Sequence, residues 1–355
     1  MSKWIDFRVP ALGYLSLLRG VLFAAFLLGA GAALSQPTGA LYGPSGVSPM
    51  AVKQGTLGSC YFHASIAAVA KASPAAIRSA ISGDAQRGYR VHFLTGPDEV
   101  VYAQDIAYAH EHAYDRSEGE WVTVLMRGYA QRALRQGMVE AVNRSTVIPM
   151  FAKPMALSVL DQTGLLLLAY DRAVRSVVSQ DGKMDKASFE AQLSRQILAL
   201  GVPAAQAQVI GGLLEQGGFY EAIARSVREN GEVFGAYRSL GQGGIPFSVL
   251  EALLGTAHSV PVTDASLTGE LRTLHAGGAA LVAGTKASGA QGSGADWFVP
   301  AHAYTVLDYD ENARTVLLRN PWGTKPGPDG VFRLPLSVFQ QVYEDFSYSQ
   351  PGGKG

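Results

Sequence analysis

Cysteine is almost absent from this sequence, because Cys60 is the only one among 355 residues. A single cysteine excludes an intramolecular disulfide, so cysteine usage says little about the redox compartment. An unpaired thiol in an exported protein is a candidate reactive group. The alternative is a buried structural cysteine, since a free cysteine behaves as a small hydrophobic residue. A base elsewhere in the chain that could serve the thiol would favour the reactive cysteine over the structural one.

Charged residues are also few, and neither sign is in excess. They make up 16% of the chain, with 29 Lys and Arg against 29 Asp and Glu, so the formal net charge is zero. Affinity for nucleic acid or for an anionic membrane surface depends on an excess of positive charge, so we expect neither as a partner. The length allows one large domain or two ordinary ones.

The apolar run near the N-terminus is short for a membrane helix. It extends from Gly20 to Leu34 after several basic residues, whereas a spanning helix needs about 20 residues. Residues 1–35 are therefore predicted to be a signal peptide, with Ala30-Gly31-Ala32 as the candidate cleavage site. An uncleaved N-terminal anchor and a buried N-terminal helix are the alternatives. We accordingly expect an exported protein that is secreted, periplasmic, or anchored in a membrane through this segment.

The segment around the cysteine has the features of a loop followed by a helix. It is QGTLGSCYF from Gln54 to Phe62, and apolar residues then recur at about the helical period. Ser73-Pro74 interrupts this pattern, so the predicted helix runs from Cys60 to about Lys71. A thiol at a helix N-terminus lies at the positive end of the helix dipole and near unpaired amide N–H groups. Both favour the nucleophilic thiolate.

Helical and strand patterns are mixed along the chain, which predicts an α+β fold. The predicted strands are Tyr89–Leu94, Glu99–Tyr102, Ala279–Gly284, Ala301–Asp308 and Thr315–Arg319, and the predicted helices are Trp121 to about Val142, Phe247–Leu254 and Leu267–His275. The first two strands form a hairpin around Thr95–Asp98, and the last two are joined by a turn at Tyr309–Ala313. A loop rich in Gly, Ser and Ala is expected from Thr285 to Asp296.

Residues from about 147 to 237 differ from their surroundings and are predicted to be mostly helical. Within them, Asp181 to Phe189 resembles the second half of an EF-hand calcium loop. Val177 and Ser188, however, stand at the first and last ligand positions, where Asp and a bidentate Glu are expected. We therefore predict a polar turn between two helices rather than a calcium site.

His302 and Asn320 are the candidates to serve the thiol. His302 begins one predicted strand and Asn320 ends the next, so a hairpin would bring them to the same end. An imidazole can take the thiol proton, and an amide oxygen can accept from the imidazole and fix its tautomer. An isolated histidine in a strand is more often structural, and Asn before Pro is usually part of a turn. Their combination with Cys60 favours the chemical interpretation.

Two further side chains complete the candidate site. The amide of Gln54 can donate to an oxyanion together with the backbone N–H of Cys60, although an ordinary loop is the alternative for this segment. Trp322 is expected to cover the His302–Asn320 hydrogen bond and to exclude water from it.

Three segments resemble the sequence motifs of calpain-type cysteine proteases. Gln54–Phe62 looks like the nucleophile motif, and His302–Val306 resembles the histidine motif. Leu317–Gly323, LLRNPWG, resembles the asparagine motif with its following Trp and is the most specific match. The similarity covers about residues 50 to 140 and 240 to 345, and the helical stretch between them looks like an insertion.

The resemblance implies a papain-like fold with a mainly helical lobe that carries Cys60 and a β-rich lobe that carries His302 and Asn320. It implies Cys60 as the nucleophile and His302 as the base and later the acid. Asn320 would orient His302, and Gln54 would be an oxyanion donor. Calcium dependence is typical of the family, but its ligands are not assignable in this chain.

Two residues beside the nucleophile depart from the family pattern. Ser59 stands where Asp is usual, and Tyr61 stands where Trp is usual. Neither has a catalytic role in this interpretation, although both neighbour the nucleophile.

The resulting prediction is a cysteine endopeptidase that hydrolyses peptide bonds of protein or peptide substrates through an acyl-enzyme. The same residues would serve an amidase or acyltransferase acting on a cell-wall or other non-protein amide. A catalytically inactive calpain-like binding protein is a further alternative. The predicted parts are a signal peptide or anchor (1–35), a linker (36–49), a helical lobe (50–146), a helical insertion (147–240), a β-rich lobe (241–348) and a tail (349–355).

Overall fold

The computed structural model describes residues 39–144, 236–262, 267–288 and 298–350, together with residues 188, 191, 192 and 195. The predicted signal peptide and nearly all of the predicted helical insertion, with its polar turn, lie outside the described residues. The chain divides into two units, residues 1–35 and 36–355, and every described residue belongs to the second. Within this described part, no helix is both long and apolar enough to cross a membrane.

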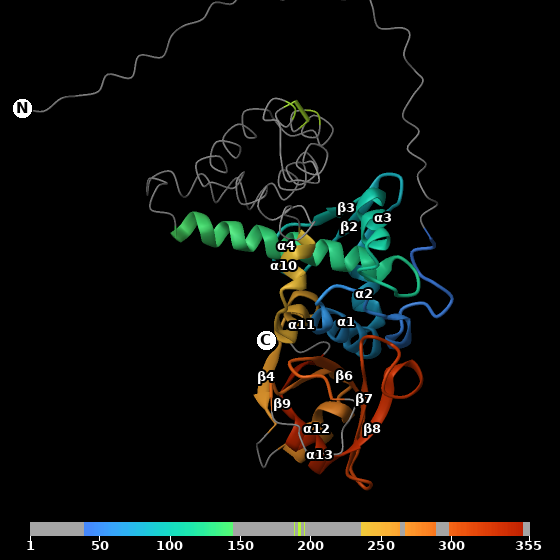
Figure 1. Ribbon diagram of the computed structural model, residues 1–355, viewed down its shortest axis with the longest axis vertical. Helices are drawn as coiled ribbons and strands as arrows, with labels where there is room; N and C mark the ends of the chain where they lie inside the picture. The colour runs from blue at the N-terminus through green and yellow to red at the C-terminus, as the bar shows by residue number, and fades with distance from the viewer. Residues whose placement is uncertain are drawn as a thin grey trace, which may run out of the picture. The chain divides into compact units, whose positions relative to one another are not determined.

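The first part of the described chain is mainly helical (Figure 1). Its helices are α1 (Cys60–Ala72), α2 (Pro74–Ala80), α3 (Ala103–Glu111), α4 (Trp121–Arg144), α10 (Ala236–Gly241) and α11 (Pro246–Leu254), preceded by the 3-10 helix η1 (Pro49–Ala51). A small antiparallel sheet contains β1 (Ile81–Asp84), β2 (Gly88–Val91) and β3 (Glu99–Val101) in that order. Helix α1 contacts α2, α4 and α11, so it lies at the centre of this part.

The second part is built on a six-stranded antiparallel sheet in the order β4-β9-β5-β6-β7-β8. Its strands are β4 (His258–Pro261), β5 (Ala280–Thr285), β6 (Ala303–Asp310), β7 (Thr315–Arg319), β8 (Val331–Pro335) and β9 (Tyr343–Ser349). Helices α12 (Leu267–Ala276) and α13 (Leu336–Val342) and the 3-10 helix η2 (Pro328–Gly330) complete it. Helices and antiparallel sheets together make the protein an α+β fold, as the sequence predicts.

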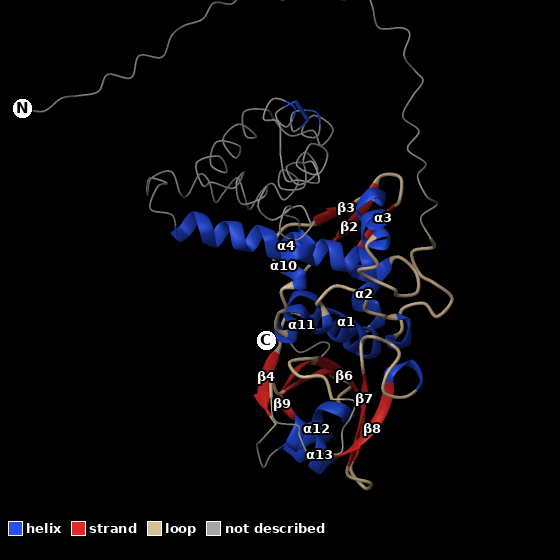
Figure 2. Cartoon of the chain, viewed as in Figure 1, coloured by secondary structure: helices blue, strands red, loops and turns tan. Residues whose placement is uncertain are grey.

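The large sheet separates two hydrophobic cores, because the side chains of each strand alternate between its faces. On β5, Val282 belongs to the core around α1, whereas Leu281 and Ala283 belong to the core that includes residues of α12 and α13. Helix α1 contacts β5 and β6, and α12 contacts β6 from the other core (Figure 2). The sheet therefore has helices on both faces.

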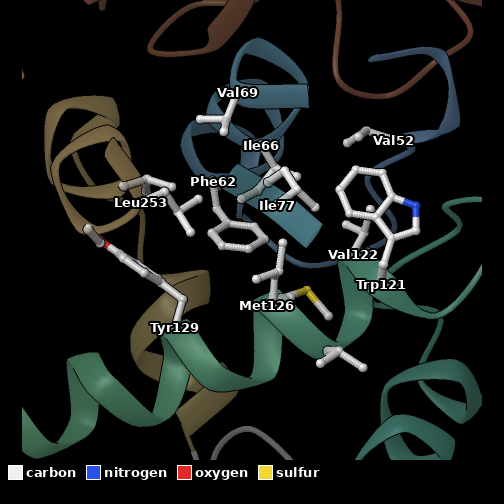
Figure 3. Close-up of a cluster of buried hydrophobic side chains, with 14 of the residues drawn as sticks. Val52, Phe62, Ile66, Val69, Ile77, Trp121, Val122, Met126, Tyr129 and Leu253 are labelled. Carbon is white, nitrogen blue, oxygen red and sulfur yellow. The ribbon is translucent and has the colours of Figure 1, made fainter. Parts of the chain in front are cut away.

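Helix α1 is held from several directions, since its residues from Tyr61 to Ala70 are all buried. Figure 3 shows Phe62 and Ile66 of α1 among side chains of α4, including Met126 and Tyr129. The rings of Phe62 and Tyr129 lie 5.5 Å apart. Because burying a side chain such as Phe or Ile stabilises a fold by about 1.5–3 kcal/mol, this packing fixes where α1 begins.

The structure confirms the main predicted elements with small shifts at their ends. Helix α1 ends at Ala72, one residue beyond the predicted Lys71, and Pro74 begins α2. The predicted hairpin forms between β2 and β3, and β6 pairs with β7. Strand β6 continues to Asp310, so the predicted turn at Tyr309 begins at Glu311 instead. A bulge between Val306 and Asp308 shifts the register and allows the strand to continue.

Part of the predicted linker hydrogen-bonds to the segment that enters α4. The backbone N–H of Gly39 donates to Glu120 at 3.0 Å, and the N–H of Trp121 donates to the carbonyl of Leu41 at 3.0 Å. Residues 39–49 therefore pack on the helical part from Gly39 onward.

Candidate active site

Cys60 is the first residue of α1, with Ser59 as its N-cap, and its side chain is partly exposed. Burial raises the pKa of the Cys60 thiol above its ordinary value, although N–H groups of Ala303, Tyr61 and Cys60 itself hydrogen-bond the sulfur and act in the opposite direction. The amide groups at the helix N-terminus thus have the predicted effect. Burial has the larger effect on the pKa of the thiol in the resting protein, because removing the thiolate from water costs more than these groups offset.

The contact with Ala303 brings the sulfur to the start of β6. Ala303 directly follows His302, so the thiol lies beside the peptide bond that joins His302 to Ala303. A second link fixes the same approach, since the hydroxyl of Thr305 donates to the carbonyl of Ala64 at 2.8 Å and both groups are buried. The helix that carries the thiol is therefore anchored directly to the strand that follows His302.

The backbone of His302 is held by Thr285, the last residue of β5. The N–H of His302 donates to the Thr285 hydroxyl at 2.9 Å, and the N–H of Thr285 donates to the His302 carbonyl at 2.9 Å. The Thr285 hydroxyl in turn donates to the carbonyl of Val299 at 2.7 Å. These bonds fix the chain on both sides of His302, which is only 6% exposed.

Asn320 lies beside His302 because β6 and β7 pair antiparallel, with Thr305 opposite Arg319. The Nε2 atom of His302 is 3.0 Å from Oδ1 of Asn320. The amide nitrogen of Asn320 donates to the carbonyl of Lys325 at 2.7 Å, and its oxygen also accepts from the N–H of Trp322 at 3.1 Å. These partners assign the amide orientation, so Nε2 of His302 carries the hydrogen and Nδ1 is the basic nitrogen of the neutral ring.

Aromatic side chains enclose the imidazole of His302. The ring of Trp322 lies 4.8 Å from it at an angle of 49°, and the ring of Tyr304 meets it edge-on at 4.9 Å. Trp322 contacts the ring but is itself 38% exposed, and its exclusion of water from the His302–Asn320 hydrogen bond stays a prediction. Burial lowers the pKa of His302 below its ordinary value, although the hydrogen bond with Asn320 acts in the opposite direction. The resting imidazole is therefore neutral at neutral pH.

Gln54 lies in the same region, but its side chain bonds within its own loop. Its Nε2 donates to the carbonyl of Leu57 at 2.6 Å, and its side chain is buried. Its backbone N–H donates to the carbonyl of Pro321 at 2.8 Å, which ties the loop to the residue after Asn320. One hydrogen of the Gln54 amide is thus engaged at rest, and the oxyanion role stays a prediction.

Sequence reasoning missed three buried polar residues near the site. His63 and Asp115 form a fully buried pair with Nε2 and Oδ1 3.4 Å apart. Arg319 donates to the carbonyl of Val52 at 2.5 Å, and burial lowers the pKa of its guanidinium to about 10. A charged residue in the apolar strand VLLR is a signal for Arg319. His63, one turn into an alanine-rich helix, has no comparable signal.

Clusters of side chains able to hold a metal ion were sought among the described residues. Among residues 39–144 and the later described segments, no three His, Cys, Asp or Glu side chains lie close enough together to hold one. The calcium dependence implied by the resemblance stays a prediction.

Comparison with known proteins leaves the site to be interpreted from its own geometry. No protein-family model and no curated protein matches the chain. Among solved structures, PepW from Lactobacillus rhamnosis HN001 aligns with 89% of this chain and 82% of its own, at 11% identity and a TM-score of 0.30. At these values the likeness assigns neither a fold family nor a function.

Proposed function

We propose that the protein is a calpain-like cysteine endopeptidase, with a helical lobe and a β-rich lobe arranged as in papain. The observation that carries the proposal is the His302–Asn320 hydrogen bond beside the single cysteine. It leaves Nδ1 of His302 as a base, while the residue after His302 contacts the Cys60 sulfur. The motif resemblance supports the same assignment of nucleophile, base and orienting amide.

In the proposed reaction, His302 Nδ1 takes the proton of Cys60 as the sulfur attacks the carbonyl carbon of a peptide bond. The oxygen becomes an oxyanion, and the N–H of Cys60 and the second amide hydrogen of Gln54 are its proposed donors. The C–N bond then breaks, and His302 returns the proton to the leaving amine. A water molecule, deprotonated by His302, attacks the thioester and releases the carboxylic acid product and the free thiol.

The resting protonation states decide how this reaction begins. Burial raises the pKa of Cys60 and lowers that of His302, so the proton resides on the sulfur before substrate binds. Proton transfer then accompanies attack, rather than preceding it in a stable thiolate–imidazolium pair. Trp322 supports this by covering the ring on which the proton arrives.

A thiol-directed epoxide probe tests the proposal on the folded protein. We expect covalent labelling of Cys60, loss of labelling in Cys60→Ala, and hydrolysis of an unfolded protein substrate by the wild type alone. Each assay is run with added calcium and with a chelator, because calcium dependence is part of the proposal by resemblance.

Three outcomes separate the alternatives. An intact protein that is not labelled at any calcium concentration contradicts the peptidase proposal. Labelling with turnover of cell-wall fragments and not of protein would favour the amidase or acyltransferase. Labelling without turnover of either would favour a binding protein. Export through residues 1–35 belongs to the same proposal, and N-terminal sequencing of the protein recovered outside the cytoplasm would test it.

A further inference from the structure

A ring of buried polar contacts surrounds the turn that leads into α1. The amide of Gln54 donates to the carbonyl of Leu57 at 2.6 Å, and the hydroxyl of Ser59 lies 3.3 Å from the same oxygen. The Ser59 hydroxyl is also 3.1 Å from Nδ1 of His63, whose Nε2 faces Asp115 at 3.4 Å. Asp115 pairs with Gln54 through a backbone bridge, which closes the ring.

The geometry constrains the protons in this ring. Nε2 of His63 faces a carboxylate and therefore carries a hydrogen. Nδ1 lies 3.1 Å from the hydroxyl and 3.0 Å from the carbonyl oxygen of Ser59. It either accepts from the hydroxyl in a neutral ring or donates to the carbonyl in a charged one. In both states His63 joins the first turn of α1 to Asp115.

Asp115 is held as a carboxylate by several donors. Its Oδ1 accepts from the hydroxyl of Ser117 at 2.5 Å, and its Oδ2 accepts from the hydroxyl of Thr123 at 2.6 Å. Burial acts to raise the pKa of the Asp115 carboxyl, but hydrogen bonds from His63, Ser117 and Thr123 outweigh it, and the pKa lies below its ordinary value. The ring of contacts thus has a negative charge at Asp115, and His63 lies between this charge and the turn that precedes Cys60.

Ser59, His63 and Asp115 have the side-chain types of a serine hydrolase triad, but burial excludes that use. All three are buried, with Ser59 and His63 at 0% exposure, so no substrate reaches the hydroxyl. The contacts instead converge on the turn that places the nucleophile. Removing any member leaves a buried polar group without its partner, which favours a rearranged turn.

We propose that His63 and Asp115 are positioning residues for Cys60, holding the Leu57–Ser59 turn so that the first N–H groups of α1 face the sulfur. Those N–H groups belong to Cys60 and to the residue after it. A displaced turn withdraws them, which makes the thiolate harder to form. The catalytic importance of this effect rests on the proposed function, but the reactivity of the thiol does not.

The test measures the alkylation rate of Cys60 by iodoacetamide as a function of pH in Asp115→Asn. We expect a roughly fivefold lower rate at neutral pH, the value of about one lost hydrogen bond, and a profile moved to higher pH. The matched control is Asp105→Asn, which disrupts another buried pair of the helical part, Asp105–Arg127 at 3.3 Å. This control variant should have a lower melting temperature, but its rate of Cys60 alkylation at each pH should equal that of the wild type.

A second pair of variants at His63 separates positioning from bulk packing. His63→Gln can still donate to Asp115 and accept from Ser59, so it should retain most of the alkylation rate. His63→Leu fills similar space but makes neither bond, so it should behave like Asp115→Asn. The other titratable groups around the sulfur are Tyr61, Tyr304 and the proposed base His302, and all three are unchanged in every variant.

The outcomes are distinguishable. Coincident alkylation profiles for Asp115→Asn and Asp105→Asn overturn the proposal, as does equal reactivity of His63→Gln and His63→Leu. If Asp115→Asn does not fold, Thr123→Val removes one hydrogen bond from the carboxylate and should give a smaller shift in the same direction, whereas no shift overturns the proposal. A wild type that hydrolyses no peptide, with the alkylation shifts intact, refutes the proposed function and leaves the positioning role standing.

Discussion

The Nε2 atom of His302 lies 3.0 Å from Oδ1 of Asn320, and the other contacts of the Asn320 amide make this a one-way hydrogen bond. Because the amide nitrogen is committed to Lys325, the oxygen must accept from the ring. The free nitrogen of His302 is therefore Nδ1. Which nitrogen of His302 is basic therefore follows from the backbone partners of Asn320, which lie outside the histidine itself.

Asn320→Ala should reduce peptide hydrolysis and leave substrate affinity nearly unchanged. The variant loses the acceptor for Nε2, so the ring can rotate and can adopt the other tautomer. A buried donor without a partner costs about 1–3 kcal/mol, which corresponds to a roughly 5- to 150-fold fall in kcat. Steady-state kinetics measure it, and an unchanged kcat would remove Asn320 from the site.

Asn320→Asp should keep the imidazole of His302 oriented. It should also shift the acid limb of the plot of kcat against pH to higher pH. A carboxylate accepts from Nε2 as the amide does, but its charge stabilises the imidazolium and raises the pKa of His302. The ring is then a base only at higher pH, so the acid limb of kcat against pH should shift upward. An acid limb that stays in place means that another group titrates there.

His302→Ala should lower the rate of peptide hydrolysis by about 10²–10⁴-fold, the usual contribution of a general base. His275→Ala is the matched control, because His275 also belongs to the β-rich part but pairs with Asp308 at 3.1 Å. The control should retain wild-type kcat. A loss of less than about threefold in His302→Ala would reject its assignment as the base.

Alkylation of Cys60 should show an alkaline midpoint in the wild type. Burial raises the pKa of the thiol, so the reactive thiolate accumulates above the ordinary cysteine pKa, near 8.5, rather than below it. The same group stabilises the fold at pH values below its unfolded pKa, and this contribution is lost as pH rises through the folded pKa. Rates with iodoacetamide across the alkaline range measure the midpoint. A midpoint well below the ordinary value would show that the helix N-terminus outweighs burial.

Much of the site could be predicted because its signals are local. The helix at Cys60 follows from apolar spacing and from Ser73-Pro74, and both its start and its end agree closely with α1. The pairing of β6 with β7 follows from two strands joined by a short turn, and it alone brings His302 to Asn320. Neither inference needed contacts between distant parts of the chain.

The unpredicted parts depend on distant pairing or on burial. Strand β9, at the end of the described chain, pairs between β4 and β5, and its Glu344 and Asp345 give no clean alternation. His63 becomes meaningful only when the chain around Asp115 returns to pair with Gln54. The net pKa of Cys60 likewise depends on burial that no local pattern reports.

Thr305→Val should destabilise the fold and loosen the link between α1 and β6. Its hydroxyl donates to the carbonyl of Ala64 at 2.8 Å in a fully buried place, and Val has nearly the same shape. Losing this bond should lower the free energy of unfolding by about 1–3 kcal/mol. Denaturant titration measures it, with Thr273→Val as the control, because the Thr273 hydroxyl makes an equally short bond of 2.8 Å to Gly269 on an exposed helix face.

The two threonine variants also test whether the link positions the thiol. Water replaces the lost donor at Thr273, so that variant should change neither stability nor Cys60 alkylation appreciably. At Thr305 no water takes the place of the hydroxyl, so a shift of α1 relative to β6 should move the Ala303 N–H away from the sulfur and slow alkylation at neutral pH. Destabilisation without any change in alkylation would mean that packing of α1, and not the Thr305–Ala64 bond, sets the distance between the thiol and β6.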